Sequence, residues 1–445
     1  MRVRDFKQYA KDLLYIALPI IMGNLGFIMI GAGDVWVAAK HSTQTLAAIS
    51  IANAIISCIL TVCIGLVGSV SPVLSNLRGQ HKSAKKYFYP TLRFAMTLAA
   101  ITSFLILLTI PLIDKMNFAD GLAPMIKQYM FVTVFSTFGA TLHMAMKEFL
   151  QAFEIVFVPN LVTVFSVFLN ILLNIIFVFG AGNIIPSMGV IGLAIASLIT
   201  RYFMGLVLLI YCYSKMKLRN YNEKGYYKTL IKVGLPISLA VMVEFVAFNG
   251  IAIFMGRMSG VYAAAQNIIC TLTTVSFMIP FAISNAIGVK VGFANGEENF
   301  VDLKRYSYIG TLMSVIFMAC SAAVFGSIPK YLVEFFTNDT ELINICIPII
   351  YILCIFQLFD GIQISLAGIF KGIKKTNYVL FANFVAYWLV SLPLGYYLAF
   401  VKNLKLAGFW IGLVSSACVL CTILGTLLFR EFKLLKAKFC DKLVR

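Results

Sequence analysis

Apolar stretches long enough to cross a bilayer recur along nearly all of the 445 residues of this chain. About 20 apolar residues in an α-helix, at a rise of 1.5 Å per residue, span the roughly 30 Å hydrocarbon layer. The composition agrees, with 61% hydrophobic residues, 12% charged residues and a mean hydropathy of +0.92. We therefore expect an all-α integral membrane protein with no soluble domain between its spans.

The apolar stretches predict twelve transmembrane helices, with ends defined to within a few residues. The expected spans are 13–39, 46–75, 90–113, 126–152, 158–180, 187–213, 229–257, 261–292, 306–328, 342–370, 377–401 and 406–430.

The net charge of +18 is unevenly divided between the two sides of the predicted membrane. Because Lys and Arg accumulate in cytoplasmic loops, their excess on the side of the N-terminus predicts that both termini are cytoplasmic, in a multi-pass protein of the inner or plasma membrane. Because Lys and Arg lie mainly in loops on one side of the predicted membrane, we expect them to face a lipid bilayer and not to bind nucleic acid. Arg201 falls inside a span, and the opposite side holds Lys40, Lys115, Lys127, Arg257, Lys330, Lys402 and Lys405.

The two halves of the chain resemble each other. Pro19 and Pro236 are 217 residues apart in similar Leu-Pro-Ile motifs, and Gly79 and Gly296 have the same separation. An even number of spans in each half gives a parallel repeat about an axis along the membrane normal. We predict an N-terminal lobe of six helices at 1–214, a basic cytoplasmic linker at 215–228 and a C-terminal lobe of six helices at 229–445.

Three carboxylates, Asp34, Glu244 and Asp360, lie inside the apolar stretches. A carboxylate near the middle of a bilayer costs several kcal/mol, so such residues usually face a protein-lined cavity and have a function. These three residues are therefore candidate ion or proton sites, and the alternative is a structural pairing of each with a Lys or Arg.

Asp34 is predicted to meet polar residues of the fifth and sixth spans. Asn170 and Asn174 are four residues apart and share a helix face, and Ser197 lies at a depth comparable to that of Asp34. One carboxylate, two amide oxygens and a hydroxyl form an all-oxygen set for a hard monovalent cation such as Na+. A proton could instead use Asp34 alone, and the amides and hydroxyl could simply join helices by hydrogen bonds.

Glu244 and Asp360 are predicted to form a second site in the other half. Glu244 follows Lys232 by twelve residues and Asp360 precedes Lys371 by eleven, which places them about 18 and 16 Å from the cytoplasmic edge. If the two carboxylates face each other, their repulsion favours a proton or Na+ between them and attracts a cationic substrate.

Aromatic side chains near this second site could bind large lipophilic cations by stacking and cation–π contacts. The candidates for lining a cavity are Phe245, Phe248, Phe277, Phe281 and Phe356, together with Met278.

The motifs of both halves together resemble the multidrug and toxic compound extrusion family, in particular its NorM-like branch, over essentially the whole chain. In the first half they are Leu18-Pro19-Ile20, Asp34 and Leu169-Asn170-Ile-Leu-Leu-Asn174 followed by Phe177-Val-Phe-Gly180. In the second half they are Gly234-Leu-Pro-Ile237, Glu244, Asp360-Gly361-Ile-Gln, Phe370-Lys-Gly-Ile-Lys-Lys-Thr376, Trp388 and Leu392-Pro-Leu-Gly395-Tyr.

The resemblance implies two pseudo-symmetric six-helix lobes around a central cavity, which export organic cations and drugs in exchange for inward Na+ or H+. By position, Asp34, Asn170, Asn174 and Ser197 match the cation site of the first lobe, and Glu244 and Asp360 match the acidic pair of the second. Two positions depart from the family pattern. Asn174 replaces an acid of another branch, which weakens a proton-only interpretation, and Phe356 replaces an aromatic hydroxyl.

The function predicted is therefore secondary active efflux of lipophilic or cationic small molecules by alternating access, in a protein expected to be a monomer. The alternative is a flippase for a lipid-linked saccharide, which would favour several basic residues in its cavity. An enzyme is not expected, because no cluster of catalytic residue types lies at an interface. No cofactor other than the coupling ion is expected, since no glycine-rich phosphate loop is present.

Overall fold

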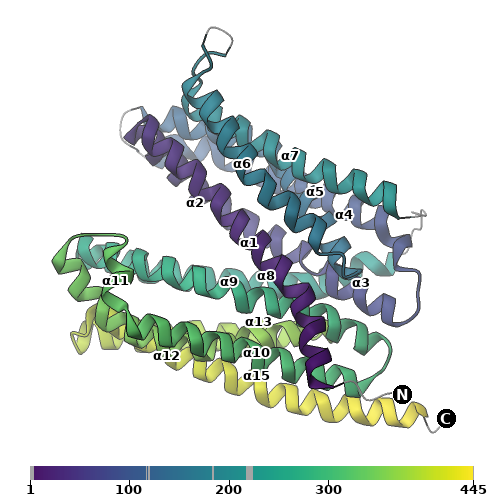
Figure 1. The fold of residues 1–445 in the computed structure, drawn as a ribbon. Helices are drawn as coiled ribbons and strands as arrows, with labels where there is room; N and C mark the ends of the chain where they lie inside the picture. Colours follow the sequence, from purple (N-terminus) through teal and green to yellow (C-terminus); the bar gives the residue numbers. More distant parts are fainter. Residues whose placement is uncertain (1–4, 117, 119–120, 183–184, 217–223, 444–445) are drawn as a thin grey trace. The chain divides into compact units, whose positions relative to one another are not determined.

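The computed structural model describes residues 5–116, 118, 121–182, 185–216 and 224–443. Its regular elements are all helices, apart from an isolated bridge between Ala181 and Ile185. In chain order (Figure 1) they are α1 (Phe6–His41), α2 (Thr43–Val67), α3 (Val70–Gly79), η1 (Ala84–Tyr87), α4 (Phe88–Thr109), η2 (Ile110–Met116), α5 (Leu122–Ala152), α6 (Phe157–Phe179), α7 (Gly189–Lys215), α8 (Lys224–Met258), α9 (Gly260–Gly296), α10 (Phe300–Ser327), α11 (Pro329–Glu334), α12 (Thr340–Gly372), α13 (Asn377–Phe384), η3 (Val385–Ser391), α14 (Leu392–Tyr396), η4 (Tyr397–Val401) and α15 (Lys405–Leu443).

Twelve membrane spans are present in the described part of the chain, as the sequence predicts. The helices extend beyond the apolar stretches at several ends: α1 begins at Phe6 and α15 continues to Leu443, whereas the apolar stretches begin at residue 13 and end at 430. Hydropathy detects only the part of a helix that lies in hydrocarbon, so it misses turns that continue into the polar boundary. The chain is a multi-pass membrane protein.

Two of the spans are interrupted. The second divides into α2 and α3 at Gly68 and Ser69, where the Ser69 hydroxyl donates to the carbonyl oxygens of Leu66 and Leu230. The eleventh alternates between α-helical and π-helical turns from α13 to η4. Pro393 has no N–H to donate to the carbonyl four residues earlier, which favours the wider π-helical turn of η3 just before it.

The structure consists of two compact helical units. The amino-terminal unit comprises Pro19–Leu74 and Lys82–Ser238, and the carboxy-terminal unit comprises Met1–Leu18, Ser75–His81 and Leu239–Arg445. Each of the helices α1, α3 and α8 thus has one end in the amino-terminal unit and the other end in the carboxy-terminal unit. Residues 217–223 of the predicted linker lie outside the described residues, and the lobe boundaries at 214 and 229 stay a prediction.

One helix is central to each unit. In the amino-terminal unit α5 packs against α2, α4 and α7, and in the carboxy-terminal unit α12 packs against α9, α10 and α15. The most apolar window of α5 is 67% buried, more than that of any other described span, and its hydropathy is the lowest. Because α5 faces other helices more than lipid, it can carry polar side chains where lipid-facing helices cannot.

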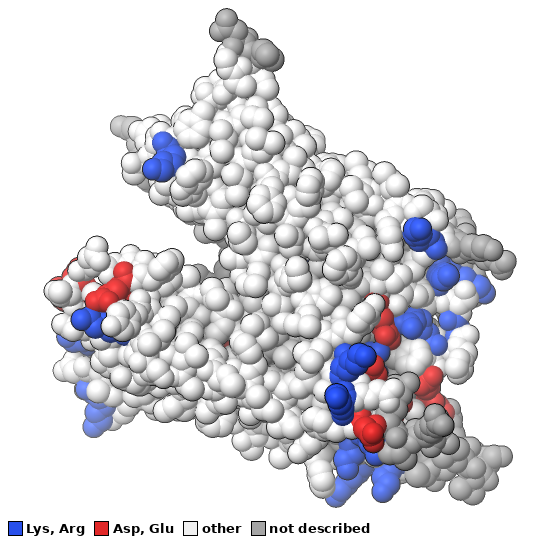
Figure 2. Space-filling model, viewed as in Figure 1, with Lys and Arg blue, Asp and Glu red and all other residues white. Residues whose placement is uncertain are grey.

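Charged side chains lie near the ends of the helices. On the face shown in Figure 2, the long middle stretches carry almost no Lys, Arg, Asp or Glu at the surface. The buried carboxylates Asp34 and Asp360, 8% and 2% exposed, are therefore exceptions to the general distribution of charge.

Candidate functional site

In the amino-terminal unit, Asp34 of α1 accepts hydrogen bonds on both of its carboxylate oxygens. The Asn174 amide of α6 donates to Oδ1 at 2.7 Å, and the Ser197 hydroxyl of α7 donates to Oδ2 at 3.1 Å. The same Asn174 Nδ2 donates to Asn170 Oδ1 at 3.1 Å. The four residues predicted to converge from three helices therefore do lie together.

Two amide atoms of this group have no hydrogen-bond partner among the described residues. They are Asn174 Oδ1 and Asn170 Nδ2, in side chains with 0% exposure. Buried polar atoms are nearly always hydrogen-bonded, so an unpaired amide oxygen next to a carboxylate requires an explanation. A cation bound by Asp34 would use such an oxygen as a further ligand.

Arg201 adds a positive charge near Asp34. It follows Ser197 by one helical turn on α7, interacts electrostatically with Asp34, and donates through Nη1 to Ser136 Oγ at 2.7 Å. Sequence reasoning left this residue inside a span without a role in the site. The sequence does hold a signal for this role, because Arg201 lies four residues after Ser197 and therefore on the same helix face.

In the carboxy-terminal unit, a chain of hydrogen bonds connects the two carboxylates. The Gln363 amide donates to Asp360 Oδ1 at 2.6 Å and, more weakly, to the Tyr387 hydroxyl at 3.4 Å. Tyr387 in turn donates to Glu244 Oε1 at 3.1 Å. Glu244 of α8 and Asp360 of α12 are thus joined through two neutral side chains, and Gln363 Oε1 is buried without a hydrogen-bond partner.

Sequence reasoning missed Gln363 and Tyr387. Gln363 was detectable, because it lies three residues after Asp360 and so shares its helix face. Tyr387 lies in the π-helical turn η3, where the residues per turn depart from the α-helical value, so its direction could not be deduced from spacing. The hydroxyl expected at position 356 is Phe356, but Tyr387 brings a hydroxyl to the site from another helix.

The predicted aromatic residues fall into two groups. Phe248 lies 6.4 Å from Phe356 and 6.2 Å from Tyr387 between ring centroids, and Phe356 lies 5.8 Å from Trp410. Phe277 and Phe281 stack on each other at 5.7 Å along α9. Phe245 follows Glu244 on α8 and is half-buried. Phe356 is only 1% exposed, and a role of these aromatic residues in lining a cavity stays a prediction.

Any cation at these sites would depend on amide and hydroxyl ligands as well as carboxylates. In the described part of the chain, no three or more His, Cys, Asp and Glu residues are grouped as they would be around a transition metal. Carboxylate, amide and hydroxyl oxygens fit a hard cation such as Na+.

The described residues form twelve candidate membrane spans, with a buried carboxylate in each of the two helical units, as expected of a membrane transporter. Residues 19–176 and 236–397 match the family model described as MatE, and the two segments begin at the prolines that mark the internal repeat. The chain belongs to the MatE family, and the resemblance to its NorM-like members is confirmed.

Individual relatives match along almost their whole length. The chain is 27% identical to a probable multidrug resistance protein NorM of Bacillus subtilis, over 93% of this chain and 94% of that protein. It is 28% identical to a protein of the same name from Photorhabdus laumondii, over 92% and 93% of the two chains. Among solved structures, a MOP superfamily transporter from Pyrococcus furiosus shares the fold with a TM-score of 0.88, 18% identity, and coverage of 96% of this chain and 97% of that one.

Proposed function

We propose that this protein is a secondary active exporter that moves lipophilic or cationic drugs out of the cell in exchange for inward Na+ or H+. Membership of the MatE family and relatives named multidrug resistance proteins support this proposal. The proposed location is the inner or plasma membrane, with both termini cytoplasmic and a monomer as the working unit. No residue is assigned a catalytic role.

The observation that carries the proposal is the hydrogen-bonded chain from Glu244 through Tyr387 and Gln363 to Asp360. Two carboxylates in one buried network repel each other unless a proton or cation lies between them. A cationic drug can neutralise them in the same way. Ion and drug therefore compete for the same negative charge, which is the basic requirement of an exchanger.

Exchange follows if each cargo changes which arrangement of the protein is favoured. A ligand shifts a conformational equilibrium only by the difference of its affinity for the two states. Ion binding from outside and drug binding from inside would each stabilise the state that carries that cargo across. Phe248, which is half-buried and packs against Tyr387, would supply apolar and cation–π contacts for a large cation.

The site around Asp34 is proposed as a second site for the coupling ion, in addition to the pair Glu244 and Asp360. Both of its carboxylate oxygens accept hydrogen bonds from neutral donors, and the unpaired Asn174 Oδ1 lies in the same group. This arrangement supports Na+ binding by several oxygens, while a proton would need only Asp34.

The test is drug accumulation in cells that express the wild type, Asp360→Asn or a matched control. Asp360→Asn keeps the size of the side chain but removes its charge, so we expect most of the efflux to be lost. Asp114→Asn is the control, since Asp114 is exposed near the end of η2 and pairs with Lys127. Efflux by Asp360→Asn equal to that of Asp114→Asn at equal expression would remove Asp360 from the mechanism.

A further inference from the structure

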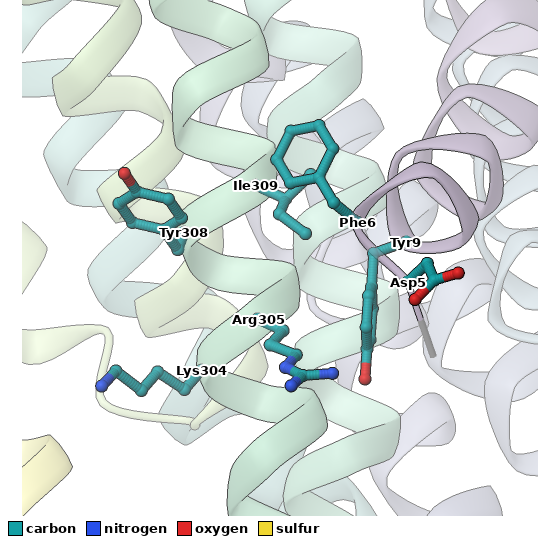
Figure 3. Close-up of a pocket in the computed structure, with 7 residues that line it drawn as sticks. All are labelled: Asp5, Phe6, Tyr9, Lys304, Arg305, Tyr308 and Ile309. Atoms are coloured by element: carbon teal, nitrogen blue, oxygen red, sulfur yellow. The ribbon is translucent and has the colours of Figure 1, made fainter. Parts of the chain in front are cut away.

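A hollow of about 480 Å³ lies between the first turns of α1 and the start of α10, within the carboxy-terminal unit. Figure 3 shows it lined by aromatic and basic side chains, among them Phe6, Tyr9, Lys304, Arg305 and Tyr308. None of these residues takes part in the carboxylate sites described above.

The hollow lies where two helices pass from charged to uncharged sequence. Lys304 and Arg305 are the last charged residues of the chain before Lys330, and α1 has no charged residue between Asp12 and Asp34. This change marks the boundary between lipid headgroups and hydrocarbon. The basic groups therefore lie at the depth of lipid phosphates. The distribution of Lys and Arg along the chain puts them on the side proposed to be cytoplasmic, where anionic lipids attract basic residues.

Arg305 is held in place by Tyr9. Its guanidinium carbon lies 5.5 Å from the centroid of the Tyr9 ring, and the Tyr9 hydroxyl donates to Asp302 Oδ1 at 2.5 Å. Tyr9 is only 1% exposed and packs edge-on against Tyr306. A fixed guanidinium loses less entropy when it binds phosphate, and its planar set of donors matches two phosphate oxygens at once.

The other residues complete a surface for an amphiphile. Lys304 and Tyr308 extend from the neighbouring face of α10, and Asp5 lies on the opposite side of the Tyr9 ring from Arg305 (Figure 3). Tyr308 and Phe6 are 68% and 56% exposed, and aromatic rings of this kind favour the interface between headgroups and acyl chains.

We propose that this hollow binds the headgroup of an anionic phospholipid, with Arg305 on the phosphate, Lys304 adding positive charge from the neighbouring face of α10, and Tyr308 and Phe6 against the upper acyl chains. The site is distinct from the proposed drug and ion sites. It would attach the first turns of α1 to α10 through a lipid of the surrounding membrane.

The experiment measures lipid binding to the full-length protein in detergent by native mass spectrometry. Dioleoyl phosphatidylglycerol is compared with dioleoyl phosphatidylcholine and phosphatidylethanolamine for the wild type, Lys304→Gln/Arg305→Gln and the control Lys82→Gln/Lys85→Gln. The control removes two exposed charges from the amino-terminal unit. Each lost charge is expected to weaken phosphatidylglycerol binding about fivefold, so the first double variant should lose about 25-fold and the control little.

Three outcomes would overturn the proposal. They are equal phosphatidylglycerol affinity in the wild type and Lys304→Gln/Arg305→Gln, no preference of the wild type for phosphatidylglycerol over the two other lipids, and displacement of the lipid by inorganic phosphate at equal phosphorus concentration. The last result would identify a site for free phosphate. If the double variant does not fold, Lys304→Gln alone is used, with the same comparison and an expected loss of about fivefold.

Discussion

At Asp34 and Asp360, neutral side chains supply the hydrogen bonds that a buried carboxylate needs. Asn174 and Ser197 serve Asp34, and Gln363 serves Asp360. A hydrogen bond to a charged group contributes about 1.5–3 kcal/mol, whereas burial of the charge costs several kcal/mol. The hydrogen bonds therefore at most offset the cost of burial, so these carboxylates add little to stability, and the proposed ion exchange would explain their presence.

Asp34→Asn tests this argument directly. We expect drug efflux to be abolished while the expression level and the melting temperature stay close to those of the wild type, because an amide fits the same space and avoids the cost of a buried charge. Efflux in cells and the melting temperature of the purified variant are the two measurements. A variant that loses efflux only because it is poorly expressed or unfolds early would assign Asp34 a structural role instead.

Tyr387→Phe tests the connection between the carboxylates of the second site. The ring keeps its packing against Phe248, but the hydroxyl that links Glu244 and Gln363 is lost. Loss of one such hydrogen bond corresponds to about 1–2 kcal/mol, so we expect the ion concentration for half-maximal efflux to rise about fivefold to thirtyfold.

The matched control is Tyr396→Phe, because Tyr396 lies on the same span and is 50% exposed. An unchanged ion dependence in Tyr387→Phe would show that the hydroxyl is not part of the ion site.

At the scale of the elements, the helices were predictable and their irregular turns were not. An apolar stretch has to become a helix in lipid, so the positions of the twelve spans follow from hydropathy. The division of the eleventh span by η3 depends on Pro393 and its neighbours, and it determines where Tyr387 points. Asp34 and its partners were predictable because they lie on regular helices, whereas the Tyr387 network needed the structure.

The glycines that mark the repeat also form a close helix contact. A Cβ on Gly79 of α3 would lie 2.1 Å from the Phe293 carbonyl oxygen, and a Cβ on Gly296 of α9 would lie 2.1 Å from that of Asn76. Beside them, Asn76 Nδ2 donates to the Gly292 carbonyl at 3.1 Å. The end of α3 is therefore fixed to α9 by direct backbone approach.

Gly79→Ala should separate these two helices and destabilise the protein. Overpacking against backbone typically costs about 1–3 kcal/mol, which should lower the melting temperature by several degrees. Gly250→Ala in α8 is the control, since no atom lies within 4 Å of its added Cβ. Equal melting temperatures for the two variants would contradict the close contact of α3 and α9.

At the scale of the whole molecule, each of the two helical units holds one site built around carboxylates. Asp34 belongs to the amino-terminal unit, and Glu244 and Asp360 belong to the carboxy-terminal unit. The repeat of 217 residues relates the helices that carry Asp34 and Glu244, yet the partners of the two acids differ, with amides and a hydroxyl in one unit and a second acid in the other. This divergence supports different roles for the two sites in one exchange cycle.

The most direct test of ion-coupled export is transport by the purified protein in liposomes, with a Na+ gradient and a proton gradient imposed separately. A tenfold gradient of the coupling ion supplies about 1.4 kcal/mol, enough to concentrate a cationic dye such as ethidium against its own gradient. We predict that one of the two gradients drives this uphill transport and that Asp360→Asn abolishes it. Failure of both gradients to drive uphill transport, or equal transport by the variant, would contradict the account.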